Sequence, residues 1–274
     1  MRYTLDGLVI RETAWGENDK RIVLLSADCG CVSVLAKGAR SLRSKYMNAT
    51  SLFTYGNYEI AERSGYAWLS GASVTEPFFG IRDSIERLAL ASYVVELAGE
   101  LTGEGEPAES ILRLTLNTLY AIAKDFKPLP QIKATYELRV MSESGYMPDL
   151  SACDVCGCER AECFYLDVMN GVIRCTECLN RLDARIPVSE DDARTNHVLV
   201  PMDPSVISAA RYVLEAPVEK VLSVLLSPAT MTDLAKMGET YAVHHLEKRL
   251  TSLDFYDDVM RGAGSAAVFN PSVK

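Results

Sequence analysis

The chain has 274 residues, of which 48% are hydrophobic, and its formal net charge is −9 at neutral pH. This length is enough to bury a core and to form two or more domains. The first residues show no basic segment followed by an apolar one, and no apolar run approaches the roughly 18 residues of a membrane helix. The sequence therefore argues against a secreted or membrane protein, and we expect a soluble, cytoplasmic one.

The first 80 residues have the pattern of short strands separated by turns. Aromatic and β-branched residues are frequent, and Asp28-Cys29-Gly30 marks a turn. Five strands in such a short segment favour an oligonucleotide/oligosaccharide-binding (OB) fold, although an SH3-like barrel or a small sandwich would show a similar pattern. The expected strands cover residues 5–11, 21–25, 31–37, 54–61 and 66–74.

Beyond residue 80 the apolar positions recur with helical spacing. Asp83, with Glu86 three residues later, predicts a capping box at the first helix. The Gly- and Pro-containing segment 103–107 separates the first two helices, and the acidic run 190–192 is expected to be a solvated loop. Further expected helices are Pro128–Ser144, Pro204–Glu215, Val218–Leu226 and about Ala229–Leu250.

Six of the eight cysteines lie close together in the second half of the chain. Cys153-x-x-Cys156 and Cys175-x-x-Cys178 are separated by 18 residues, a spacing typical of four-cysteine zinc sites. Zinc prefers four soft donors in a tetrahedron, and each Cys-x-x-Cys turn supplies two of them. We therefore predict one Zn²⁺ bound by these four cysteines.

The cysteines also allow other interpretations. Cys158 and Cys163 could replace one of the four ligands or remain spare thiols. A catalytic zinc usually has a His or carboxylate ligand and an open position, but His197, His244 and His245 all lie outside the cysteine-rich segment. A redox dithiol would leave the second Cys-x-x-Cys pair unexplained. We expect a structural zinc, no catalytic residues and no enzymatic activity.

A basic segment follows the third expected strand. Lys37, Arg40, Arg43 and Lys45 occur within nine residues, and no acidic residue appears between positions 37 and 50. Such a segment attracts phosphates through counterion release. Tyr46 and Phe53 follow it and could stack on bases. The alternative is a solvated basic loop beside aromatic residues of the core.

The distribution of charge leaves room for such a basic surface. Residues 1–80 contain 9 Lys/Arg and 8 Asp/Glu, a net of +1, whereas residues 81–274 contain 19 Lys/Arg and 29 Asp/Glu, a net of −10. We therefore expect any broad contact with nucleic acid to be confined to the first part of the chain.

Four stretches taken together resemble the bacterial RecO family of DNA repair and recombination mediators. They are Lys37-Gly38-Ala39-Arg40, Tyr136–Arg139 with Gly145–Leu150, the two Cys-x-x-Cys pairs, and Tyr241–Phe255. The resemblance implies an OB-fold, a helical domain and a zinc module. It also implies binding of single- and double-stranded DNA, annealing of complementary strands, and loading of recombinase onto strands coated by single-stranded DNA-binding protein. The implied partners are RecR and the acidic C-terminal tail of that protein, and the implied location is the cytoplasm, on the nucleoid.

We thus predict an α+β multidomain chain with an N-terminal OB-fold barrel and an α-helical domain that carries a four-cysteine zinc module. The main alternative is a zinc-braced protein-interaction scaffold with little DNA binding of its own. Lys133 and Arg139 are candidates for contact with an acidic tail, or simply solvated helix charges. The predicted parts are 1–80 (DNA-binding OB-fold), 81–150 (helical domain, first part), 151–185 (zinc module), 186–258 (helical domain, second part) and 259–274 (flexible tail).

Overall fold

The computed structural model describes residues 1–183 and 198–267, with side chains in the last helix described as far as residue 262. The chain divides into two compact units, one formed by residues 1–129 and 250–274 and the other by residues 130–249. The helical residues that we predicted as one domain in two parts thus divide between the two units. The predicted loop at 190–192 lies outside the described residues. Among the described helices, none combines the length and apolar character needed to cross a membrane.

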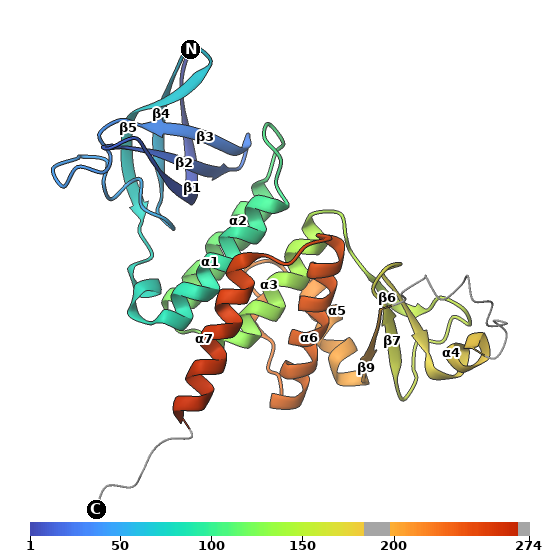
Figure 1. Cartoon of the computed structure of the whole chain (residues 1–274). Helices are drawn as coiled ribbons and strands as arrows, with labels where there is room; N and C mark the ends of the chain where they lie inside the picture. The colour runs from blue at the N-terminus through green and yellow to red at the C-terminus, as the bar shows by residue number, and fades with distance from the viewer. Residues whose placement is uncertain (184–197, 268–274) are drawn as a thin grey trace, which may run out of the picture. The chain divides into compact units, whose positions relative to one another are not determined.

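The first unit begins with a closed five-stranded barrel, drawn in blue and cyan in Figure 1. The strand order around the barrel is β1-β2-β3-β5-β4, and all pairs are antiparallel except β3 with β5. This confirms the predicted OB-like barrel. The strands are β1 (Arg2–Trp15), β2 (Asp19–Ser26), β3 (Gly30–Ala36), β4 (Tyr55–Arg63) and β5 (Tyr66–Glu76).

Alternation of side chains along the strands builds the barrel core. In β4, Tyr58 and Ile60 are buried whereas Glu59 between them is exposed, as the two-residue period of a strand requires. Tyr58 also donates a hydrogen bond of 2.7 Å to the Ala49 carbonyl oxygen, which anchors the loop between β3 and β4. Burial raises the pKa of the Tyr58 phenol, so the hydroxyl stays a donor.

Three helices complete the first unit: α1 (Ile85–Glu100), α2 (Glu109–Ala123) and α7 (Thr251–Ala267), with the short 3₁₀ helix η1 (Phe79–Asp83) before them. The loop after α1 pairs with the β2–β3 turn, since Cys31 N donates to Gly103 O and Gly105 N donates to Cys29 O. A Cβ on Gly30 would lie 2.3 Å from Gly103 O, so only glycine allows this approach. The barrel and the helices are therefore joined by backbone hydrogen bonds as well as by the chain.

The second unit combines helices with a small sheet of order β6-β8-β7-β9. In Figure 1 this sheet and α4 lie together; α4 and the strands before it are drawn in yellow tones and β9 in orange. Its elements are α3 (Leu129–Glu143), β6 (Asp149–Cys153), β7 (Phe164–Asp167), β8 (Val172–Cys175), α4 (Thr176–Asp183), β9 (Leu199–Met202), α5 (Pro204–Glu215), η3 (Val221–Ser223) and α6 (Pro228–His245).

Several predicted boundaries were wrong. The cap of α1 is Ser84, whose side chain accepts a hydrogen bond from Arg87 N, because η1 extends through Asp83. Only the three residues of η3 are helical within the predicted helix 218–226. The predicted helix 229–250 ends at His245. Finally, α7 continues to Ala267, where we expected a tail from residue 259; its glycines lower helix propensity without ending the helix.

Candidate metal centre and nucleic-acid interface

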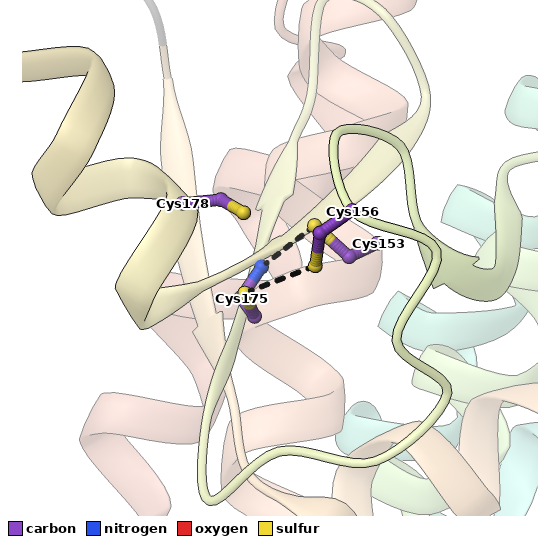
Figure 2. Close-up of side chains that lie close together, drawn as sticks. All are labelled: Cys153, Cys156, Cys175 and Cys178. Atoms are coloured by element: carbon purple, nitrogen blue, oxygen red, sulfur yellow. Dashed lines mark hydrogen bonds between the residues drawn. The ribbon is translucent and has the colours of Figure 1, made fainter.

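Four cysteine side chains converge in the second unit. Cys153 ends β6, Cys156 lies in the turn that follows, Cys175 ends β8, and Cys178 belongs to the first turn of α4. Figure 2 shows their sulfur atoms facing one another, and all four lie within 4.8 Å of each other. Strand pairing between β6 and β8 brings together two halves of the cluster that are far apart in the sequence.

The geometry of the cluster fits a tetrahedral metal. The Sγ atoms of Cys156 and Cys175 lie 3.8 Å apart, which equals the edge of about 3.8 Å that four Zn–S bonds of about 2.3 Å define. The donor set is four soft thiols, and neither a histidine nor a carboxylate belongs to this described group. Such a set suits a closed zinc site better than a hard cation.

Backbone amides surround the thiols with positive partial charge. Burial raises the pKa of the Cys153 thiol, but hydrogen bonds from the amides of Cys175, Cys156 and Val155 outweigh burial and lower it to about 6. The amide of Cys158 likewise lowers the pKa of the Cys156 thiol. The turn that aims these amides passes through Gly157, which has a φ of 72°. The thiolate forms of Cys153 and Cys156, which a metal requires, are thus favoured before any metal binds, whereas a hydrogen bond with Cys156 raises the pKa of the Cys178 thiol.

The two additional cysteines differ in position. The Cys158 thiol hydrogen-bonds with Cys156 and Cys175, so it lies beside one edge of the cluster. The Cys163 thiol instead donates to the Phe164 carbonyl oxygen at 3.4 Å. Neither belongs to the convergent group of four.

The predicted phosphate contacts lie in the loop between β3 and β4. Lys37, Arg43 and Lys45 are exposed. Arg40 is exposed too, but its Nη1 donates to the carbonyl oxygens of Gly16 at 3.1 Å and Glu17 at 3.0 Å. Arg40 therefore fixes the β1–β2 turn, while the other three cations face solvent.

The two predicted stacking residues have different surroundings. Tyr46 is half-buried, donates to the Ser70 carbonyl oxygen at 2.6 Å, and has Lys45 Nζ 4.8 Å from its ring centre. Phe53 is only 1% exposed. The prediction that Phe53 stacks on bases is therefore wrong, because its ring lies in the core, where a base cannot reach it.

Two exposed aromatic residues were missed by the sequence interpretation. Trp15 ends β1 and is 47% exposed, and Tyr66 starts β5 and is 57% exposed. Both line a cleft of about 670 Å³ on the barrel, together with Arg21, Ser33 and Arg63; we call it the seam cleft. The sequence signal for such a residue was an aromatic side chain directly beside a predicted turn. We interpreted Tyr66 only as evidence for a strand.

Comparison with known proteins identifies the family. The family model "Recombination protein O N terminal" matches residues 1–78, and "Recombination protein O C terminal" matches residues 82–254. The chain belongs to the RecO family. It is 30% identical to the DNA repair protein RecO of Anaeromyxobacter sp. (strain K), over 94% of this chain and 97% of that protein. It is also 29% identical to the DNA repair protein RecO of Acetivibrio thermocellus, over 91% and 94% of the two chains.

The two RecO models correspond to parts of the structure. The N-terminal model covers the barrel and ends just after β5, and the C-terminal model begins within η1 and ends within α7. All four clustered cysteines fall inside the C-terminal model. The chain is thus a RecO-family DNA repair protein with a five-stranded barrel, a helical region and a four-cysteine cluster.

Proposed function

We propose that this RecO-family chain is a DNA repair and recombination mediator that binds single- and double-stranded DNA through its barrel. The observation that carries the proposal is the exposed group of cations after β3, Lys37, Arg43 and Lys45. They lie within residues 1–80, whose net charge is +1, whereas residues 81–274 have a net charge of −10. Among the described residues, none of these three side chains has an ion-pair partner that would compete with a phosphate.

The same surface suits the annealing of complementary strands. Two complementary strands repel each other through their phosphates, and cations that neutralise part of this charge let base pairing proceed. We propose that the chain acts in this way without catalysing a covalent reaction, in the cytoplasm on nucleoid DNA. It would help load recombinase onto strands coated by single-stranded DNA-binding protein.

RecR and the acidic tail of single-stranded DNA-binding protein are the partners that we propose, on the basis of family membership. Lys133 and Arg139 no longer serve as candidates for the tail. Lys133 Nζ lies 2.8 Å from a Glu137 oxygen, and Arg139 donates to the carbonyl oxygens at the end of α5. Both side chains are occupied within the second unit.

We further propose that Cys153, Cys156, Cys175 and Cys178 hold one structural Zn²⁺. The cluster consists of four thiols with the spacing of a zinc tetrahedron, and its sheet is small. A metal would supply cross-linking that so few apolar residues cannot, and its binding energy would stabilise the fold.

Titration of a labelled single-stranded oligonucleotide at several salt concentrations tests the DNA proposal. We expect the triple variant Lys37→Ala, Arg43→Ala, Lys45→Ala to bind more weakly and to reduce the slope of log affinity against log salt by about 2. Arg181→Ala, an exposed cation on α4, is the matched control and should leave the slope unchanged. An unchanged slope in the triple variant would favour the interaction-scaffold alternative. A strand-annealing assay with and without RecR extends the test to the mediator role.

A further inference from the structure

The seam cleft lies where the barrel closes. The parallel pair β3–β5 has a single register pair, Leu35 with Trp68. Towards the start of β3, Ser33 lines the cleft instead of pairing with β5. The barrel seam is therefore open beside Ser33, and its volume of about 670 Å³ falls in the range of small-molecule binding pockets.

Two hairpins hold aromatic rings at this opening. Trp15 pairs with Asp19 across the β1–β2 turn, and this turn is fixed by Arg40. Tyr66 pairs with Arg63 across a turn whose central residues, Ser64 and Gly65, both have positive φ. This is the two-residue geometry that best matches the twist of the flanking strands. Both exposed rings are thus carried by hydrogen-bonded strands.

The charges around the seam cleft cancel. Arg21 and Arg63 line it together with Glu62 and Glu104. A site with two cations and two anions gains little from counterion release, so it is not a second phosphate-binding surface. What distinguishes the cleft is the pair of exposed aromatic rings, which offer flat apolar faces to a flat ligand.

We propose that the seam cleft binds unpaired nucleobases of single-stranded DNA, with Trp15 and Tyr66 as stacking partners. The inference rests on the proposed DNA-binding function and deepens it, since the loop cations would hold phosphates and the cleft would hold bases. Bases inside a duplex are not available for such stacking. The cleft therefore adds affinity for single strands that depends little on salt.

The decisive experiment compares an oligothymidine with an abasic strand of the same length, which has the phosphates without the bases. With the full-length protein at high salt, the wild type should bind the oligothymidine at least about tenfold more tightly than the abasic strand, as stacking of one or two bases implies. The variants Trp15→Ala and Tyr66→Ala should lose most of that difference and keep their affinity for the abasic strand. Trp15→Phe and Tyr66→Phe, which retain a ring, should restore much of it.

Tyr120→Ala is the matched control, because Tyr120 is exposed to a similar degree on α2 of the same unit. It should leave both affinities unchanged. If Trp15→Ala and Tyr66→Ala discriminate the two strands as the wild type does, the cleft proposal is overturned. The DNA proposal fails separately, through an unchanged salt slope of the Lys37, Arg43 and Lys45 variant.

Intrinsic fluorescence gives a second readout, because Trp15 and Trp68 are the two tryptophans of the chain. In the variant Trp68→Phe, Trp15 is the sole reporter. Saturation with oligothymidine should quench its emission, whereas saturation with the abasic strand should not. Equal emission with both strands would contradict stacking on Trp15.

Discussion

Lys133 Nζ and Glu137 Oε1 form an ion pair of 2.8 Å along α3, with side chains that are 4% and 0% exposed. Glu239 of α6 approaches the same ammonium group at 2.7 Å, and Arg249 in turn pairs with Glu239 at 2.9 Å. Burial alone would lower the pKa of Lys133, but attraction to Glu137 and Glu239 outweighs it and raises that pKa. The ammonium group is thus charged at neutral pH and joins α3 to α6.

Removal of one charge from this buried group should lower the free energy of unfolding. We expect Lys133→Met to reduce the free energy of unfolding by about 3–5 kcal/mol, because it leaves the buried Glu137 carboxylate without this cation. The double variant Lys133→Met, Glu137→Leu should recover much of the loss. Urea unfolding measures both. Glu177→Ala on α4 breaks a highly exposed pair with Arg181 and should change stability by less than about 1 kcal/mol. Equal losses for single and double variants would show that packing, not charge, sets the effect.

The same group predicts a dependence of stability on acid. Burial would raise the pKa of Glu239, but Lys133 and hydrogen bonds from Lys133 and Arg249 outweigh burial and hold it below its ordinary value. The stabilisation is therefore fully present above the unfolded pKa of about 4.3 and is lost as pH falls through the lower folded pKa. Relative to Glu239→Gln, the wild type should lose stability more steeply below about pH 4. Parallel curves for the two proteins would argue against this ionic contribution.

Phe53 should matter for stability and not for DNA. Its ring is buried, its backbone has a φ of 69°, and its amide donates to the Val9 carbonyl oxygen. We expect Phe53→Ala to cost about 3–5 kcal/mol through the cavity that it leaves. Phe53→Leu should cost less, and the folded protein should bind oligonucleotide with unchanged affinity. A selective loss of DNA binding at full stability would restore the stacking role that we reject.

Metal analysis should separate ligands from bystanders among the cysteines. We expect Cys175→Ser to lose bound zinc and to destabilise the second unit, because ligand loss removes folding energy. Cys158→Ser and Cys163→Ser should keep one zinc per chain. Metal content by elemental analysis, together with thermal unfolding before and after chelation, measures both effects. Loss of zinc from Cys158→Ser would show that Cys158 is a ligand.

Local patterns in the sequence were enough to predict the barrel and the cysteine cluster. Tyr58 and Ile60 are apolar positions on either side of the charged Glu59, and such local alternation indicates a strand without reference to residues distant in sequence. The cysteine spacing is also a local signal. Each Cys-x-x-Cys turn presents two thiols by itself, and one sheet is enough to bring the two turns together.

Features that depend on contacts distant in sequence could not be predicted. Asp83 and Ser84 are both good caps, and the choice between them depends on where η1 ends. Phe53 beside a basic run has the same sequence pattern as a base-stacking residue, and only its burial in the folded chain shows that a base cannot reach its ring. Arg40 looked like a free cation, because its hydrogen bonds to the β1–β2 turn join residues more than twenty positions apart.

The contribution of α7 to the first unit has a consequence for the order of events during protein synthesis. Its buried Leu253 and Tyr256 belong to a helix that packs with α1, yet residues 130–249 are translated between the two. At about 5–20 residues per second, roughly ten seconds separate the completion of α2 from the arrival of α7. During this interval the nascent barrel and its first helices expose the apolar surface that α7 later covers. The unit that contains the barrel is thus completed only after the whole second unit has been synthesised.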